Sequence, residues 1–586
     1  MSQYEAPVEE TLFLMLRVLG TERYRDIDAL AGLNEESLRP VLEGAGKFAE
    51  EKLAPLNASG DAEGCTLQSD GSVSTPRGFR EAFRQLSAAG WNGVAAPAEF
   101  GGQGLPYVVA AAIEEFLNGA NQSLYMYTNW GFYAAALLAD LDLPDLRNDY
   151  LPRLVSGEWG GAMAMTEPQA GTDLGLIQTS AVPHPDGSYR ITGSKIFISG
   201  GEHDLTENIV HFVLARIKGA PAGARGISLF LVPSKLAGCG SPNGVRCTAV
   251  EHKMGVRGSA TCGLHFEAAK GWLIGEEHRG LRRMFRILNH ARRACGVAAV
   301  GAAEAAYQKA AAHVKERRQG RAPSGALRPD EPAAPLIAQA DVRRLLLRTR
   351  SFLEAGRALF LWHALQQDIA ERSPDPAART AAEGHVALLT PIVKAVLSDF
   401  SYRSAIDAQQ LFGGHGYIVA TGIEQYSRDI RMLMLAEGAN GVQAMDLVGR
   451  KLLADGGAIF HAFAGEVSRQ IDDMAGLNAQ LGMAMRRALD DLEDAAAVLM
   501  SMETVDTGAV AYDFMTGLGI VALGFMWLKI ARASVGVGGV EPEGVDAGRM
   551  RRAEFFMRCY LPDAAACVAR IRSADPTMMK LDIGVF

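Results

Sequence analysis

The sequence predicts a mainly α-helical protein with a central antiparallel β domain, and three observations support this fold class. Apolar residues recur at helical spacing in the first part of the chain and again in its second half. The stretch between them contains short β-branched and aromatic segments separated by Gly, Pro, Asn and Asp. The regular strand–helix alternation of Rossmann and TIM folds is absent from the sequence. We therefore expect an N-terminal helical extension (1–35), an N-terminal helical domain (36–160), a middle β domain (161–275), a helical bundle (276–455) and a C-terminal helical extension (456–586).

The N-terminal helical domain is predicted from periodicity and from helix breakers. Apolar residues at helical spacing span Glu36–Leu53, and Pro55 follows as a breaker. The same spacing recurs over Ala110–Gly119 and Tyr133–Ala139, after a glycine-rich loop at Phe100–Pro106. This region thus reads as helices joined by loops.

Strands of the middle domain are predicted from composition. Four segments are short, β-branched or aromatic, and bounded by turn residues, which is typical of an antiparallel sheet. They are Tyr189–Ser199, Asn208–Ile217, Ile227–Pro233 and Gly263–Glu267.

Residue patterns typical of helices recur after the β domain. Residues 294–313 are almost all small, which lets helix backbones approach closely, and a Pro-rich loop follows at 322–335. Long amphipathic stretches then cover Asp341–Gln367 and Ala377–Gln410, and a last helical block begins near residue 457. The longest uncharged apolar run, Phe514–Leu528, is shorter than the roughly 18–20 residues that span a bilayer. We expect it to be a buried bundle helix and expect no transmembrane segment.

Composition narrows the class of protein. The 586 residues are 48% hydrophobic and 21% charged, which excludes a disordered, collagenous or disulfide-scaffold protein. Lys and Arg number 58 against 67 Asp and Glu, a formal net charge of −9, so a nucleic-acid coat is not expected. Glycine is frequent, at 64 residues, or about 11% against roughly 7% on average. A function that uses glycine heavily has to account for this excess.

Cysteine usage and the N-terminus predict a cytoplasmic location. The seven cysteines are an odd number with no C-x-x-C spacing, which argues against a disulfide framework and a zinc site, and we expect no metal. The first residues are acidic, unlike a signal or transit peptide. The sequence also contains no P-loop, no H-E-x-x-H, no G-x-S-x-G and no G-x-G-x-x-G after a strand.

The specific signal is a set of four segments in a fixed order. They are AMAMTEPQAGTD (162–173), KIFIS (195–199), QLFGGHGY (410–417) and MLMLAEGANGVQAMDL (432–447). On a helix–sheet–helix plan this set resembles the acyl-CoA dehydrogenase flavoprotein family over about residues 36–450. The sequence most resembles the 3-methylmercaptopropionyl-CoA dehydrogenase branch of this family. That resemblance is carried by the C-terminal extension and by the segments AGKFAEEKLAPLN, FGGQGLP and NGVQAMDLVGRK.

The resemblance implies an FAD site. The first two segments would supply contacts to the flavin ring from Met163, Met165 and Thr166, a pyrophosphate contact from Thr172, an aromatic from Phe197 and a hydroxyl near N5 from Ser199. The FAD of a neighbouring subunit would be reached by Arg317, Gln319, Gln410, Gly413 and Gly414. Guanidinium groups match phosphate oxygens, and glycines allow backbone N–H groups to approach a cofactor. A homodimer or a dimer of dimers follows from this pattern.

The resemblance also implies a base and a substrate site. Glu437, before Gly438 and after an apolar run, matches the family's catalytic carboxylate, and an apolar wall should raise its pKa toward neutrality. Glu304, near the place where some members carry the base, is the runner-up. Asn289 and Arg292 match the residues that contact pantetheine, and Gly438 adds a substrate contact.

The implied reaction is α,β-dehydrogenation of an acyl-CoA thioester to the trans-2-enoyl-CoA. Glu437 would take the Cα proton while a hydride leaves Cβ for flavin N5, and electrons would pass to an electron-transferring flavoprotein. Ala436 replaces the family's usual aromatic, Ala439 its usual Thr and Phe197 its usual Trp. We expect Ala436 to widen the pocket over the thioester, which favours a bulkier or branched acyl group.

Three alternatives remain at this level. An acyl-CoA oxidase would keep the fold and pass electrons to oxygen. A DNA-binding relative is disfavoured because residues 452–586 carry 12 Lys and Arg against 18 Asp and Glu. A non-catalytic scaffold is disfavoured by the presence of Glu437.

Overall fold

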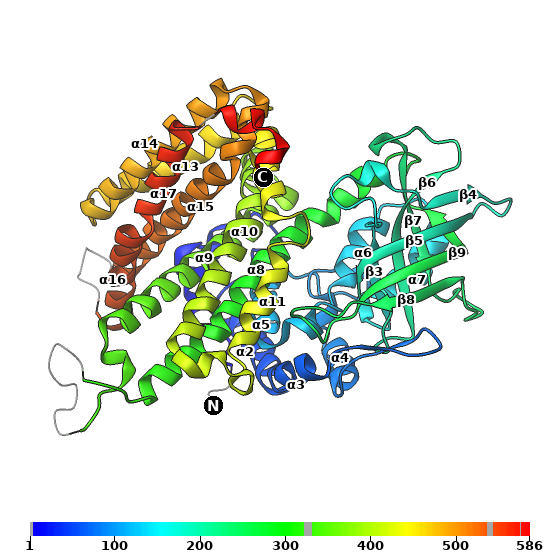
Figure 1. The fold of residues 1–586 in the computed structure, drawn as a ribbon, viewed down its shortest axis with the longest axis horizontal. Helices are drawn as coiled ribbons and strands as arrows, with labels where there is room; N and C mark the ends of the chain where they lie inside the picture. Colours follow the sequence, from blue (N-terminus) through cyan, green and yellow to red (C-terminus); the bar gives the residue numbers. More distant parts are fainter. Residues whose placement is uncertain (1–3, 322–330, 536–542, 575) are drawn as a thin grey trace. The chain divides into compact units, whose positions relative to one another are not determined.

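The computed structural model describes residues 4–321, 331–535, 543–574 and 576–586. The chain divides into two compact units (Figure 1). Unit 1 contains the chain up to Gly46, Pro106–Gly119 and Arg292–Phe586, and unit 2 contains Lys47–Leu105 and Ala120–Ala291. Most of the Pro-rich loop predicted at 322–335 falls outside the described residues.

Helices form the first layer of unit 2. They are η3 (Ala49–Leu53), η4 (Ala54–Leu56), α3 (Asn57–Glu63), α4 (Phe79–Ala88), η5 (Trp91–Gly93), η6 (Ala98–Phe100), α6 (Trp130–Leu138) and α7 (Pro144–Ser156). Helices α6 and α7 pack on strand β3 (Trp159–Ala164) through one buried apolar cluster that includes Trp130, Leu151 and Trp159. Trp130 stacks on Phe212 of strand β6 (Asn208–Ile217), with ring centroids 5.9 Å apart. The sheet and its helices therefore share a core.

The sheet of unit 2 is mostly antiparallel, as predicted. Its strands are β3 (Trp159–Ala164), β4 (Ser180–Pro183), β5 (Tyr189–Ser199), β6 (Asn208–Ile217), β7 (Ile227–Pro233), β8 (Val245–Val250) and β9 (Thr261–Leu273). They follow the order β3-β6-β4-β5-β9-β7, with β8 also on β9 and a further pairing of β6 with β7. Two pairings, β3–β6 and β4–β6, are parallel, which the sequence did not predict. A separate pair, β1 (Thr66–Leu67) and β2 (Val73–Ser74), is antiparallel.

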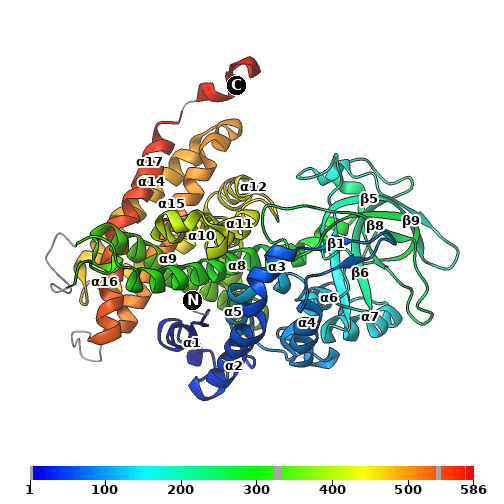
Figure 2. The same cartoon turned by 60° about the horizontal axis from the view of Figure 1, so that its bottom comes forward.

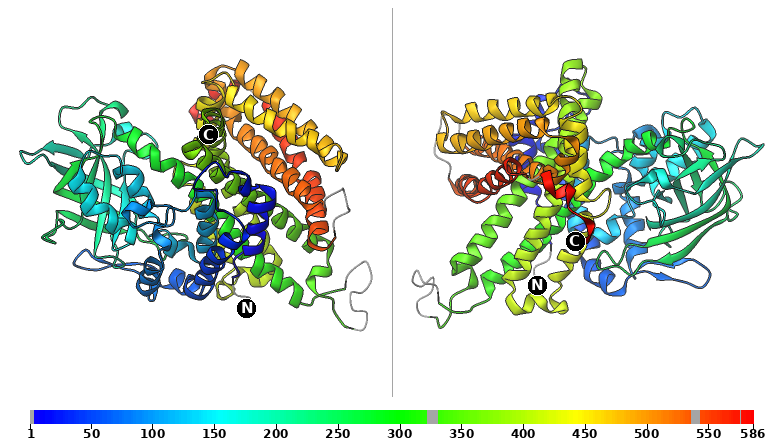
Figure 3. Two further views of the ribbon diagram at one scale, coloured as in Figure 1. Left: turned by 180° about the vertical axis from the view of Figure 1, so that it is seen from behind. Right: turned by 45° about the horizontal axis from the view of Figure 1, so that its top comes forward.

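Unit 1 is built around three long helices. These are α8 (Gly280–Glu316), which begins in unit 2, α9 (Ala340–Arg372) and α10 (Pro376–Leu411). The other elements before the C-terminal extension are α1 (Val8–Leu12), η1 (Phe13–Val18), η2 (Thr21–Arg23), α2 (Glu35–Phe48), α5 (Tyr107–Tyr125), η9 (Leu336–Ala338), η10 (Gly413–Tyr417), η11 (Val419–Thr421), α11 (Glu424–Leu433), α12 (Asn440–Asp446) and η12 (Leu447–Leu452). Figure 3 shows α1 and η1, in dark blue, beside the green helices of this unit.

Small residues on α8 allow the close helix approach that the sequence predicted. A Cβ at Gly296 would lie 2.1 Å from the carbonyl oxygen of Val393 on α10. A Cβ at Gly301 would lie 2.6 Å from the carbonyl oxygen of Glu115 on α5. Any larger side chain at either position would push these helices apart, so part of the glycine excess serves backbone-to-backbone packing.

The C-terminal extension is helical and packs on α9 and α10. It contains α13 (Ala458–Met474), α14 (Ala479–Ser501), α15 (Thr504–Ser534), α16 (Gly544–Cys559), α17 (Leu561–Arg572), η13 (Pro576–Lys580) and η14 (Ile583–Val585). Figures 1 and 2 show these helices in orange and red alongside the green ones, with the C-terminal residues beyond α17. The run Phe514–Leu528 lies in α15 and is buried as predicted, and Trp527 there donates to the Ser351 carbonyl (3.0 Å).

Within the described parts of the chain, two helices are long and apolar enough to cross a membrane by length and composition alone. They are α10 and the Asp506–Ser534 part of α15, with 61% and 89% of their most apolar windows buried in the protein. Burial of this kind is typical of the core helices of a folded protein.

Candidate functional site

The predicted base, Glu437, lies in a strained turn between α11 and α12. Its φ is +55°, in the left-handed region that non-glycine residues rarely adopt, and Gly438 follows at φ +82°. A Cβ on Gly438 would lie 2.8 Å from Nε2 of Gln443. Backbone strain of this kind costs free energy and is common at functional sites, because the surrounding structure must hold it.

Hydrogen bonds from α12 hold this turn. Gln443 is fully buried, and its side-chain Nε2 donates to the carbonyl oxygens of Glu437 (3.1 Å) and Gly438 (3.2 Å). The Asn440 N–H donates to the Met434 carbonyl (3.1 Å), across the turn. Neither Gln443 nor Asn440 was among the predicted site residues, although both lie in the quoted segment NGVQAMDL.

The carboxyl group of Glu437 is desolvated on one side. Its Oε2 is fully buried, and it accepts no hydrogen bond within the described parts of the chain. Burial raises the pKa of Glu437, while the positive charges of Arg292 and Lys394 act in the opposite direction. The pKa of the nearby Cys295 thiol rises to about 12, mainly through burial and then through the charge of Glu437. A carboxylate with a raised pKa and a bare oxygen is suited to accept a proton.

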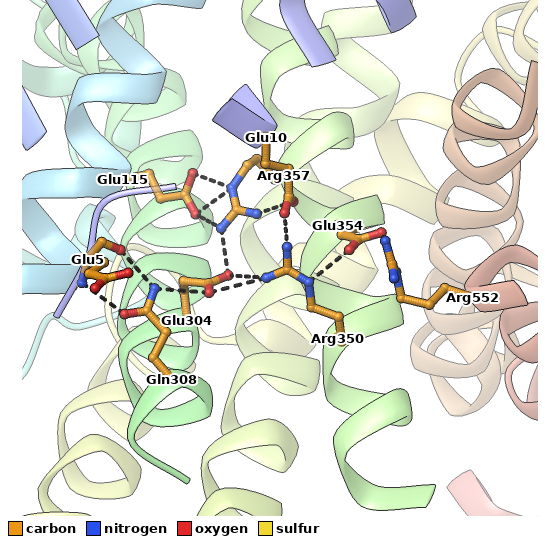
Figure 4. Close-up of polar contacts among 9 residues, drawn as sticks. All are labelled: Glu5, Glu10, Glu115, Glu304, Gln308, Arg350, Glu354, Arg357 and Arg552. Atoms are coloured by element: carbon orange, nitrogen blue, oxygen red, sulfur yellow. Dashed lines mark hydrogen bonds and ion pairs between the residues drawn. The ribbon is translucent and has the colours of Figure 1, made fainter. Parts of the chain in front are cut away.

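The runner-up base, Glu304, is engaged in a buried ion cluster instead (Figure 4). Its side chain is 2% exposed and accepts from Arg357 Nη2 (2.8 Å) and Arg350 Nη1 (3.3 Å). Arg357 also pairs with Glu115, and both arginines pair with Glu10. Glu304 is thus paired with two guanidinium groups, so it acts as a structural ion and is not free to serve as a base.

In unit 2 the structure brings together two of the quoted segments. The Ile196 N–H donates to the Thr166 carbonyl (3.0 Å), so the residues after β3 lie against strand β5. The buried Lys195 Nζ donates to the Met165 carbonyl (2.9 Å) and to Glu167 Oε1 (2.8 Å). Met163, Met165 and Thr166 are half-buried at this junction.

The buried pair of Lys195 and Glu167 was missed by sequence reasoning. Burial by itself would raise the pKa of Glu167, but the Lys195 charge and the N–H donors of Thr179 and Gln178 lower it to about 2. A charged Lys195–Glu167 pair can therefore persist there, and Lys195 fixes the Met165 carbonyl. The signal in the sequence was the lysine within the predicted strand Tyr189–Ser199, next to the apolar residues Ile196 and Phe197.

Phe197 and Ser199 are both exposed, while Ile198 between them is buried, so the two share a face as expected. The strand is not regular there, however. Phe197 has φ +60° and the register with β9 shifts between Lys195 and Ile198. Its ring is 60% exposed. An aromatic held outward by a bulge is available to contact another group.

The remaining predicted residues lie on helix ends and loops. Thr172 is exposed next to Asp173, which caps η7 (Leu174–Leu176). Asn289 is exposed on α8, and Arg292, one turn later, is half-buried with its Nη1 3.8 Å from Asp446 Oδ2. Arg292 therefore faces the base turn as well as Asp446.

The residues predicted to reach a neighbouring cofactor lie just after α8, at the end of α10 and in η10. All are exposed: Arg317, Gln319, Gln410, Gly413 and Gly414. Beside them lies a cavity of about 440 Å³, lined by Lys309, Ala312, His313, Glu316, Phe412, His415, Ile418, Ala420 and Thr421. The His313 and Phe412 rings stack there with centroids 4.1 Å apart. The cavity combines flat rings with basic side chains. Among the described residues no group of three or more His, Cys, Asp or Glu side chains could hold a metal ion.

Comparisons with known protein families match four successive parts of this chain. The matching descriptions are acyl-CoA dehydrogenase N-terminal domain (35–158), middle domain (162–269) and C-terminal domain (278–453), and acetyl-CoA dehydrogenase C-terminal like (463–582). The last match covers the helical extension.

Relatives of similar length share the whole chain. A 3-methylmercaptopropionyl-CoA dehydrogenase of Ruegeria pomeroyi is 37% identical over 98% of this chain and 99% of its own. A broad-specificity linear acyl-CoA dehydrogenase of Mycobacterium tuberculosis, FadE5, is 32% identical over the full length of both. The solved structure of an acyl-CoA dehydrogenase complexed with FAD from Bacillus anthracis shares the fold, with a TM-score of 0.75, 19% identity and coverage of 94% of this chain and 91% of that one.

Proposed function

This chain belongs to the acyl-CoA dehydrogenase family, as its motifs predicted, and from that premise we propose that it dehydrogenates an acyl-CoA thioester with Glu437 as the base. The observation that carries the proposal is Oε2 of Glu437, which is buried in a strained turn and accepts no hydrogen bond from any residue that the structure describes. The enzyme is FAD-dependent, like its family. The product is the trans-2-enoyl-CoA.

The residues present fit FAD. The cavity at the end of α8 offers stacked rings with Lys309 and His415 beside them, which suits an aromatic ring system that carries phosphates. The space that a Cβ would take at Gly413 and Gly414 is open, so backbone groups there can be approached. We propose that Arg317, Gln319, Gln410, Gly413 and Gly414 hold this cofactor. In unit 2 the same role falls to Met163, Met165, Thr166, Thr172, Phe197 and Ser199.

When bound, FAD accepts the hydride that leaves Cβ of the acyl group. Glu437 takes the Cα proton, and its raised pKa brings a carboxylate closer to the acidity of a thioester α-hydrogen. Arg292 and Lys394 keep that pKa from rising further, so the charged form remains accessible. We propose that the main-chain N–H of Glu437 donates to the thioester oxygen, as an oxyanion-hole donor. Asn289, Arg292 and Gly438 contact the CoA ester.

We propose an electron-transferring flavoprotein as the acceptor of the two electrons. The alternative, an oxidase, would release hydrogen peroxide in air and would not reduce that partner. We also propose that Ala436 leaves room beside the thioester for a branched or thioether acyl group. The thioether class follows the name of the Ruegeria relative.

The test is anaerobic mixing of the yellow holoenzyme with a panel of straight-chain, branched and thioether acyl-CoAs. At least one should bleach the flavin. Glu437→Gln should retain FAD and lose about 10²–10⁴-fold in bleaching rate, the usual contribution of a general base. Glu304→Gln serves as the matched control and should bleach at the parent rate. Bleaching of Glu437→Gln at the parent rate would contradict the base assignment.

A further inference from the structure

We propose that the C-terminal helical extension helps to hold the catalytic base, through a hydrogen-bond chain from Tyr512 to Asp399 to Asn440, with Lys394 as a buried cation on the same chain. This inference rests on the proposed role of Glu437. Tyr512, Asp399, Asn440 and Lys394 are positioning residues, because each acts on Glu437 through the turn or through its charge and none is proposed to touch substrate.

Asn440 is the centre of the chain. It begins α12 three residues after Glu437, and its side chain is 4% exposed. Its Nδ2 donates to Asp399 Oδ1 (2.7 Å), with Ser398 Oγ also within reach (3.1 Å). Its Oδ1 accepts from Lys394 Nζ (2.7 Å). Asn440 therefore ties the start of α12, and with it the Glu437 turn, to helix α10.

Lys394 is a buried cation with few counter-charges. Its side chain is fully buried, and the carboxylates that face it are those of Glu437 and Asp399. Burying an ammonium group is costly unless opposite charges offset it. The charge of Lys394 therefore depends on both carboxylates, and in return it favours the ionised form of each.

Tyr512 links the C-terminal extension to this chain of hydrogen bonds. Its hydroxyl donates to Asp399 Oδ2, from helix α15. Helix α15 also lies close to α12, since a Cβ at Gly508 would be 3.5 Å from the sulfur of Met445. Tyr512 is 41% exposed as a whole residue, so removing its hydroxyl alone does not leave a cavity in the core. Tyr512 of the extension thus completes the set of hydrogen bonds that connects α15, α10 and the start of α12.

The charged and titratable groups that face Glu437 come from two helices. Arg292 and the Cys295 thiol lie on α8, and Lys394 lies on α10. Arg292 is partly compensated by Asp446 of α12 at 3.8 Å. Removing the Lys394 charge would leave Arg292 as the remaining cation, so the acidic limb of the reaction should move to higher pH.

The experiment follows flavin reduction by the best acyl-CoA of the panel, anaerobically and against pH, in the holoenzyme. Lys394→Met should move the acidic limb of the limiting rate up by about one pH unit, a roughly tenfold loss of rate on that limb, with little change in KM. Tyr512→Phe should lower the limiting rate about two- to fivefold, the cost of roughly 0.5–1 kcal/mol in a hydrogen bond. Lys394→Gln provides a second neutral variant if Lys394→Met does not fold.

Matched controls come from the same extension. Lys529→Met removes a mostly buried lysine of α15 that pairs with Glu466, and Tyr560→Phe removes a buried hydroxyl that donates to the Arg348 carbonyl. Both should leave the pH profile unchanged. A profile of Lys394→Met that superimposes on the parent profile, or equal shifts in the controls, would overturn the inference.

A second readout does not depend on activity. Amide hydrogen exchange of residues 434–443, followed by mass spectrometry on the holoenzyme, should be faster in Tyr512→Phe than in Tyr560→Phe. Unchanged hydrogen exchange at residues 434–443 would overturn the inference that Tyr512 holds the Glu437 turn through hydrogen bonds. Failure of every acyl-CoA to bleach the parent enzyme would refute the proposed function instead, and the exchange result would still decide whether Tyr512 holds the turn.

Discussion

The side-chain amide of Gln443 donates a hydrogen bond to the main-chain carbonyl of Glu437, with 3.1 Å between Nε2 and O. The same nitrogen reaches the Gly438 carbonyl, so one buried side chain holds both residues of the left-handed turn. A strained turn persists only where its surroundings favour it. Gln443 is a main part of those surroundings.

We expect Gln443→Ala to loosen the turn. The variant should lose about 1–3 kcal/mol of unfolding free energy, because it leaves two carbonyls without their donor and opens a small cavity. Flavin reduction should fall while FAD remains bound. Urea unfolding and anaerobic bleaching measure the two effects. Gln470→Ala, at a buried position on α13, is the control, and equal losses of bleaching in both variants would refute a specific role for Gln443.

Gly438→Ala should be far more damaging than Gly441→Ala. Position 438 has φ +82°, and a Cβ there would lie 2.8 Å from Gln443 Nε2. At Gly441 a Cβ would meet nothing within 4 Å. We expect a cost of about 1–2 kcal/mol at 438 from the left-handed backbone alone, with loss of bleaching. At 441 we expect unchanged stability or a slight gain within α12. Thermal unfolding of the two variants compares them directly.

Glu437→Gln should remove one pH-dependent contribution to the free energy of unfolding that the parent protein has. Because the pKa of Glu437 is raised in the folded state, its contribution is fully present below the unfolded value of about 4.3 and is lost as pH rises through the folded value. Glu437→Gln should therefore gain stability over the parent as pH rises, by about 1.4 kcal/mol for each unit of the shift. Urea midpoints at acidic and neutral pH test this, and a constant difference between the two proteins would contradict the raised pKa.

The rate of flavin bleaching in the parent enzyme should also depend on the ionisation of Glu437, and it should increase with pH. Only the ionised carboxylate accepts a proton, so the limiting rate should rise with pH through the raised pKa of Glu437 and then level off. Stopped-flow reduction against pH gives this limb. A rate that stays constant as the pH falls to the ordinary pKa of a glutamate, about 4.3, would contradict a desolvated base.

The ion cluster around Glu304 predicts a large loss of stability without a catalytic effect. Arg357 is fully buried and pairs with Glu10, Glu115 and Glu304 (Figure 4). Arg357→Met should cost about 3–5 kcal/mol, because buried carboxylates lose their counter-charge. The control is Arg39, which also pairs with glutamates but has a side chain that is 32% exposed, against 0% for Arg357. Arg39→Met should shift the urea midpoint much less. Similar shifts would show that burial does not matter here.

Local patterns predicted many of the elements correctly. Strands β5, β6 and β7 have the predicted bounds, and helices α9 and α10 contain the predicted amphipathic stretches. The buried run in α15 and the close approach of α8 to its neighbours were also foreseen. Each of these depends on the periodicity or size of neighbouring residues, which a sequence displays directly. The order of the four motifs was sufficient to recognise the family.

Pairings between distant residues came only from the tertiary structure. The parallel register of β3 on β6, the outward bulge at Phe197 and the ion cluster that occupies Glu304 all join segments far apart in the chain. The same holds for the turn at Glu437, which Gly438 and Asn440 follow. Its motif named the base, but the partners Gln443, Lys394 and Tyr512 became evident only in three dimensions. A hydrogen bond between helices depends on how those helices pack, and no periodicity within either one encodes it.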